Sequence, residues 1–181
     1  MMTLHWLLSY LTLPGTVLRA FLEHVCLKIL RVPVEDTAYL QRNELCGHVE
    51  HKPVDTAGKA SVLCFVPGFL MLLIGAALCV PAALQMFYMG VTPVSIETGG
   101  VSVMFIVCAV LYYCGVSVWC HVFPSYEDAL YLHEAFTQAN PAARIFLFLP
   151  VTVARAGAFV QRFGVFPLLW IAATVCMIVF G

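Results

Sequence analysis

The sequence has few charged residues for its length. Only 10% of its 181 residues are Asp, Glu, Lys or Arg, whereas 62% are apolar, and the mean hydropathy is +0.93. An ordinary soluble domain carries about 25% charged residues. The scarcity of charge therefore excludes a typical soluble domain, and the high hydropathy excludes a disordered chain, which requires the opposite composition. A membrane domain is the class that remains.

The sequence also lacks a surplus of basic residues. Nine Lys and Arg stand against ten Asp and Glu, so no basic face is available to neutralise phosphates, and we expect no nucleic-acid partner. No two of the eight cysteines are spaced Cys-x-x-Cys, and most lie inside apolar runs. We therefore expect free thiols, buried as small apolar side chains, rather than a disulfide framework.

Three apolar runs are candidates for membrane-spanning helices, because about 20 apolar residues of helix cross a hydrocarbon core of about 30 Å. They cover residues 60–89, 101–123 and 164–181, of which the last is short but uncharged. We expect Pro67 and Pro81 to break the first run and to leave 62–83 as its spanning part.

Two further segments are apolar but interrupted by charge. Residues 1–30 have neither the basic start nor the cleavage site of a signal peptide, so we expect a retained helix that spans the membrane fully, enters it partway or lies in the interface. Pro14 and Gly15 mark a break or a helix start inside it. In residues 142–163, arginines recur at helical spacing, which predicts an amphipathic interfacial helix, with a tilted half-span as the alternative.

The sequence thus predicts one all-α domain, a polytopic membrane helical bundle. It would contain about three full spans, an N-terminal partial or full span and an interfacial amphipathic helix. Its segments are an N-terminal apolar helix (1–30), a cytoplasmic polar segment (31–59), three spans (60–89, 101–123 and 164–181) and cytoplasmic and interfacial helices (124–163).

The charged residues are segregated along the chain. All nine cations lie within 19–59 or 144–162, and the connection 88–100 between the first two spans has none. Two spans separate the cationic segments, so both lie on one side, which the positive-inside rule makes cytoplasmic. Nine of the ten acidic residues lie there too, with Glu97 as the exception. We expect the plasma membrane of a prokaryote, with 31–59 and 124–163 in the cytoplasm.

One histidine pair lies in the polar segment, as His48-Val-Glu50-His51. On a helix the two imidazoles would share a face and Glu50 would orient a ligand, whereas on a strand they would point to opposite faces. Gly47 and Pro53 favour an extended conformation. Two imidazoles fall short of the three or four ligands that zinc requires.

A capped helix is expected where the second span ends. Ser125 is a good N-cap residue with Asp128 at the third helical position, so a helix should cover 126–139. His121 and Asp128 would then face the cytoplasmic membrane boundary beside Glu23 and His24.

Three segments together resemble signatures of integral-membrane zinc metalloproteases of the site-2-protease type. They are Pro-Gly-Thr at 14–16, Gly-His-Val-Glu-His-Lys-Pro at 47–53, and His-Val-Phe-Pro-Ser-Tyr-Glu-Asp-Ala at 121–129, in the family's order and spacing. The resemblance implies a membrane-embedded helical fold. It also implies a zinc-binding His-Glu-x-x-His helix soon after Pro-Gly-Thr.

This chain departs from the family at the catalytic motif. It reads Arg19-Ala-Phe-Leu-Glu23 in that place, so both imidazoles and the catalytic base are missing. Arg19 and Glu23 are four residues apart, and we expect them to form an ion pair within the helix, where the resembled family binds zinc. The resulting hypothesis is a non-catalytic membrane scaffold or regulator. It would bind a transmembrane protein or peptide partner within the lipid bilayer and would need no cofactor.

Two alternatives stay open. A zinc-dependent, membrane-embedded protease with displaced ligands would use Glu23 as its catalytic candidate and His24, His121 and Asp128 as metal candidates. A small transporter is less favoured, because the second and third spans contain no charged residue and a transport pathway normally has polar groups at mid-membrane.

Overall fold

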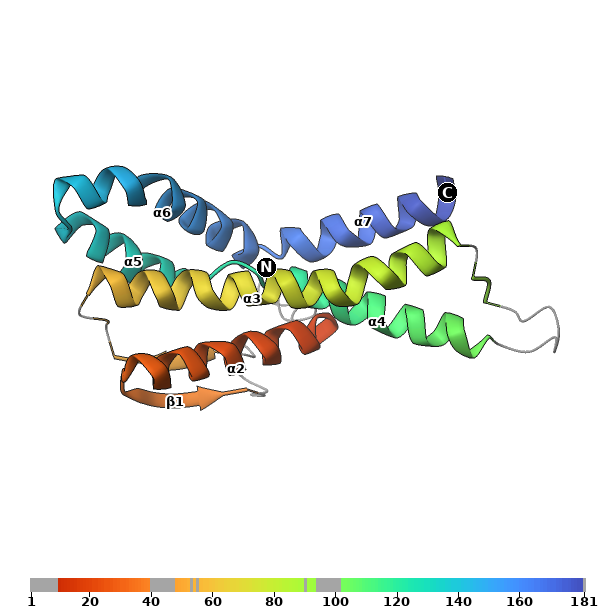
Figure 1. Cartoon of the computed structure of the whole chain (residues 1–181), viewed down its shortest axis with the longest axis horizontal. Coiled ribbons are helices and arrows are strands. Elements are labelled where there is room, and N and C mark those ends of the chain that lie inside the picture. Colours follow the sequence, from red (N-terminus) through yellow and green to blue (C-terminus); the bar gives the residue numbers. More distant parts are fainter. Residues whose placement is uncertain are drawn as a thin grey trace.

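The chain forms a mostly helical structure with one β-hairpin, described here by a computed structural model (Figure 1). The structure describes residues 10–39, 48–52, 54, 56–89, 91–93 and 102–180. Its elements are α2 (Leu13–Leu30), β1 (Val34–Ala38), β2 (His48–His51), α3 (Ala57–Ala83), the π-helical turn η1 (Leu84–Tyr88), α4 (Val103–Trp119), α5 (Tyr126–Gln138), α6 (Pro141–Arg162) and α7 (Val165–Phe180).

Helix α2 begins where Pro14 and Gly15 predicted a helix start. Pro14 occupies the first turn, where its missing N–H costs no hydrogen bond. Ser117 of α4 completes this helix end, because its Oγ accepts from the Gly15 amide at 2.8 Å and donates to the Thr12 carbonyl at 2.9 Å. At the other end, Arg31 adopts a left-handed conformation and its amide bonds back to α2.

Helix α3 corrects the expectation that two prolines break the first apolar run. The helix is continuous through both Pro67 and Pro81, and only the π-helical turn η1 follows the second. A proline removes one backbone hydrogen bond and crowds the preceding turn, which packing against neighbouring helices can compensate. Pro67 is fully buried in such packing.

The helices differ in how well they match a membrane span. Two are long and apolar enough to cross a bilayer, Ala57–Tyr88 and Arg144–Gln161. Helices α4 and α7 are shorter, with 17 and 16 residues, so three full-length spans are not confirmed. The segment predicted as an interfacial helix is α6. It lies alongside α5, which in turn packs on α3 (Figure 1). Because residues 144–161 are long and apolar enough to cross a bilayer, this helix fits the tilted half-span as well as the interfacial helix.

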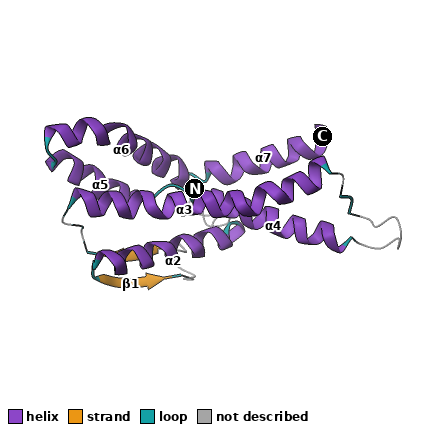
Figure 2. Ribbon diagram, viewed as in Figure 1, coloured by secondary structure: helices purple, strands orange, loops and turns teal. Residues whose placement is uncertain are grey.

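The helices at one end of the molecule contain no charged residue in the part of the chain that the structure describes. The second half of α3 lies beside α4 and α7 there, while α2, the hairpin, α5 and α6 surround the first half of α3 (Figure 2). Residues 69–89, 103–119 and 165–180 contain no charged side chain. The rise of residues 69–88 along the helix axis is about 30 Å, the thickness of a hydrocarbon core.

The polar segment forms an antiparallel hairpin, one strand of which is the extended piece expected around residues 48–51, so the all-α prediction is incomplete. Strand β1 pairs with β2, with an irregularity between Val34 and Asp36. Val49 is 4% exposed and packs in one cluster with Ala20, Leu27 and Leu63 of the helices. The hairpin is therefore part of the core on the α2 side.

The cysteines behave as the composition predicts. The seven in the described part of the chain are free thiols, and five of them are buried. Cys46 lies outside the described residues.

Close helix packing depends on Gly115. A Cβ placed there would lie 2.6 Å from the backbone nitrogen of Cys79, so α3 and α4 approach through a residue that has no side chain. Small residues at such crossings are typical of helix packing in membranes, where close van der Waals contact drives association.

We expect Gly115→Ala to lower the thermal unfolding midpoint of the detergent-solubilised protein by several degrees, because the new methyl group forces two backbones apart at a cost of about 1–3 kcal/mol. Gly58→Ala is the matched control, since a Cβ at Gly58 meets nothing within 4 Å. Equal midpoints for the two variants would contradict the α3–α4 contact.

Candidate functional site

Arg19 and Glu23 form a buried ion pair on α2. The Arg19 Nε donates to the Glu23 Oε1 at 2.5 Å, and each residue is only 5% exposed. One helical turn separates the two residues, so their side chains share the face of α2 that packs against α3 and α4. The ion pair expected from the sequence between residues 19 and 23 is therefore present.

The guanidinium of Arg19 also joins α2 to the α4–α5 connection. Its Nη1 donates to the carbonyl of Val122 at 3.0 Å and to that of His121 at 3.4 Å. Gly68 of α3 lies against the Val122 carbonyl, which leaves no room for a side chain there. The buried Nη2 has no hydrogen-bond partner among the described residues. Arg19 therefore cross-links α2 to the α4–α5 connection, and its Nη2 donors have no partner among the described residues.

His51 and Asp128 form a second buried pair, which links β2 to α5. The His51 Nε2 lies 2.9 Å from the Asp128 Oδ1, and the two side chains are 6% and 7% exposed. The predicted cap positions the carboxylate, because the Ser125 Oγ accepts from the Asp128 amide at 3.0 Å and starts α5. An extended β2 directs His51 toward that helix end.

The environment of His51 favours its protonated form. The hydrogen bond to Asp128 is the main cause that raises the pKa of the imidazole, and burial opposes it. The Lys52 carbonyl, bonded at 2.8 Å to Nδ1, and the negative charges of Asp128 and Glu23 raise the pKa further. The pair is therefore charge-assisted when His51 is protonated.

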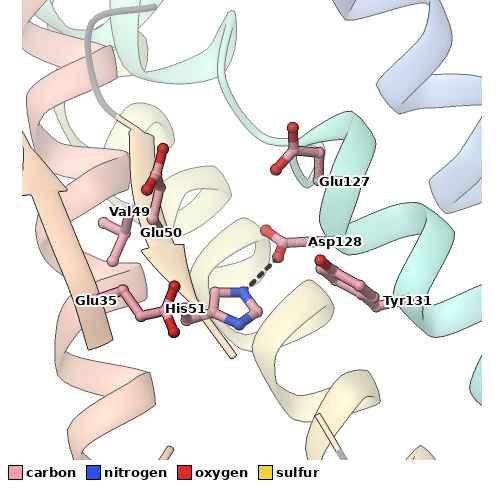
Figure 3. Close-up of a pocket in the computed structure, with 7 residues that line it drawn as sticks. All are labelled: Glu35, Val49, Glu50, His51, Glu127, Asp128 and Tyr131. Carbon is pink, nitrogen blue, oxygen red and sulfur yellow. Dashed lines mark hydrogen bonds and ion pairs between the residues drawn. The ribbon is translucent and has the colours of Figure 1, made fainter. Parts of the chain in front are cut away.

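A pocket of about 220 Å³ lies between the hairpin and α5. Figure 3 shows Glu35, Val49 and Glu50 of the hairpin on one side and Glu127, Asp128 and Tyr131 of α5 on the other, with His51 reaching across to Asp128. Its lining includes four carboxylates and one imidazole. The pocket is acidic, and Glu35, Glu50 and Glu127 in its lining are exposed to solvent.

The structure does not bring the four metal and catalytic candidates together. Glu23 pairs with Arg19 and Asp128 pairs with His51. His24 and His121 each take another partner, the hydroxyl of Tyr39 at 2.6 Å from His24 Nδ1 and that of Thr12 at 2.7 Å from His121 Nε2.

No group of three His, Cys, Asp or Glu side chains in the described part of the chain is arranged to hold a metal ion. The displaced ligand set is therefore not assembled in this conformation. His48 belongs to β2, but its side chain is outside those described, and Glu50 is exposed at the pocket.

Several site residues had no signal in the sequence. Tyr39 and Glu35 come from the polar segment without a motif around them, and Val122 contributes only a carbonyl oxygen. The His51–Asp128 pair joins residues 77 positions apart, a separation at which no local pattern reports a contact.

Comparison of the chain with protein-family models, curated proteins and solved structures finds no match. What the site does must therefore be inferred from its own chemistry: two buried ion pairs, four carboxylates around an open pocket, and a charge-free helical end.

The raised pKa of His51 predicts a stability that depends on pH. The pair contributes fully below the ordinary imidazole pKa of about 6.5, and this contribution is lost as pH rises through the raised folded-state value. We expect the unfolding midpoint of the wild type to exceed that of His51→Ala at about pH 6 and the gap to shrink toward about pH 9. His133→Ala, an imidazole on α5 away from the pair, should show no such convergence.

The Arg19–Glu23 pair predicts strongly non-additive mutations. Arg19→Met or Glu23→Leu alone leaves one buried charge unpaired and should cost about 3–5 kcal/mol of unfolding free energy. The double variant removes both charges at similar volume and should recover most of that loss. Chemical denaturation in mild detergent measures the cycle, with the exposed Glu134→Gln as a control within about 0.5 kcal/mol of wild type. Additive losses would mean that the two side chains do not interact.

Proposed function

We propose that the chain is a non-catalytic membrane protein resembling site-2-type metalloproteases, acting as a scaffold or regulator that binds a membrane protein or peptide partner. The observation that carries this proposal is the buried Arg19–Glu23 pair. It stands at the two positions where the resembled family has zinc-binding imidazoles.

The chemistry of the pair opposes metal-dependent hydrolysis. Zinc requires neutral nitrogens or anionic ligands with free lone pairs, whereas Arg19 supplies a fixed positive charge that repels a divalent cation. The Glu23 carboxylate is bonded to that guanidinium at 2.5 Å, so it is poorly placed to act as a general base. Asp128, a metal candidate in the displaced-ligand alternative, is bonded to His51.

The charge distribution supports a membrane position. In this proposal the uncharged end of the molecule crosses the hydrocarbon core, with α3 as the long span and α4 and α7 as shorter companions. The polar segments 31–59 and 124–163 then lie in the cytoplasm, as expected for the plasma membrane of a prokaryote. The Arg19–Glu23 pair falls close to the boundary, because Arg19 lies beside Gly68 at the start of the uncharged stretch.

Exposed apolar side chains outside the uncharged end support a binding role. Phe21 and Ile29 on α2 are 52% and 75% exposed, and Ile145 and Phe146 on α6 are 77% and 83% exposed. Apolar surface of this kind is covered in the cell by lipid or by another protein. A membrane scaffold uses such faces to hold its partner.

Metal analysis tests the proposal directly. Wild-type protein purified without chelator should contain well under one zinc per chain, because the described residues assemble no ligand set to bind it. Stoichiometric zinc that disappears in His24→Ala or His121→Ala, but persists in His133→Ala, would instead establish the displaced-ligand protease.

Restoring the family motif tests the correspondence of positions. Arg19→His, Ala20→Glu and Glu23→His together recreate His-Glu-x-x-His at residues 19–23. We expect this variant to bind zinc close to one per chain and to lose affinity when Asp128→Asn is added. Failure of the folded triple variant to bind zinc would show that these residues do not occupy the family's metal position.

A further inference from the structure

The hairpin is attached very differently on its two sides. Toward α2 it is held by the buried Val49 and by a 2.6 Å hydrogen bond between the Tyr39 hydroxyl and His24. Toward α5 the described contacts are the 2.9 Å bond from His51 to Asp128 and the ring contact of His51 with Tyr131, whose centroids are 5.9 Å apart. The α5 side is therefore the weaker attachment.

Electrostatic repulsion acts across the same gap. The hairpin presents the exposed carboxylates of Glu35 and Glu50 to the pocket, and Asp128 lies on the opposite wall (Figure 3). Like charges facing each other across a pocket favour its opening. The His51 imidazole is the group that bridges this acidic gap, so it opposes the repulsion with one short bond.

We propose that the β1–β2 hairpin is a flap, hinged on α2 and held against α5 by the His51–Asp128 bond. Breaking that bond swings the pocket edge of the hairpin away from α5 and gives solvent access to Asp128. The turn at Arg31, with its left-handed backbone, lies where the chain leaves α2 toward the flap. This flap movement does not depend on the proposed scaffold function, because an enzyme or a transporter could use it as well.

The experiment measures the distance between the flap and α5. Spin labels attached through p-acetylphenylalanine at Lys52 and Glu134, both exposed, avoid the native cysteines. Pulsed electron-paramagnetic resonance on the full chain in nanodiscs then reports the closed and open populations. Wild type should give one predominant short distance. His51→Ala and, separately, Asp128→Asn should raise the open-to-closed ratio at least about tenfold, because each removes a charge-assisted bond.

A matched pair of second mutations tests the repulsion. In the His51→Ala chain, adding Glu50→Gln removes a pocket carboxylate and should lower the open-to-closed ratio about two- to fivefold. Adding Asp36→Asn removes an exposed charge from the same hairpin that does not line the pocket, and should leave the ratio unchanged. About 0.5 M salt should reproduce the effect of Glu50→Gln by screening.

Three results would overturn the flap. The first is an unchanged short distance in both His51→Ala and Asp128→Asn. The second is equal recovery by Glu50→Gln and Asp36→Asn, which would mean that general charge rather than the pocket controls the distance. The third is a broad distribution typical of an unfolded chain, which would make His51 a general core residue.

Discussion

The buried guanidinium of Arg19 is the constraint on which the rest of this end of the molecule depends. A charge at this depth must be paired and hydrogen-bonded, because leaving it unpaired costs several kcal/mol. Glu23 neutralises it from one turn away, and the carbonyl of Val122 takes another donor. Satisfying one side chain thus determines where the end of α4 lies relative to α2, and Gly68 lets α3 close over the same point.

The two ion pairs of the site differ in range, because one is local and the other joins distant parts of the chain. Arg19–Glu23 is internal to one helix, whereas His51–Asp128 crosses from the hairpin to α5. Together they occupy the carboxylates of Glu23 and Asp128, so in this structure both act as polar cross-links. The uncharged end has no such pairs, and it depends on close helix contact at Gly115 instead.

Features that depend on neighbouring residues could be predicted from the sequence, and those that depend on distant contacts could not. The helix start at Pro14, the cap at Ser125 and the i, i+4 pair on α2 all follow from spacings of one turn. The continuity of α3 through Pro67 depends on neighbouring helices, so local rules predicted a break there. The partners of His24, His51 and His121 lie 15 to 109 residues away, which periodicity cannot report.

The closure of the α2 end by Ser117 sets an order of events during synthesis. The Gly15 amide and the Thr12 carbonyl already bond to each other at 3.1 Å, and the Ser117 hydroxyl that bonds to both lies 102 residues beyond Gly15. At a translation rate of about 5–20 residues per second, that hydroxyl emerges roughly 5–20 s later. The first turn of α2 therefore forms with its own backbone bonds, and the contact that fixes it against α4 forms only after Ser117 has been synthesised.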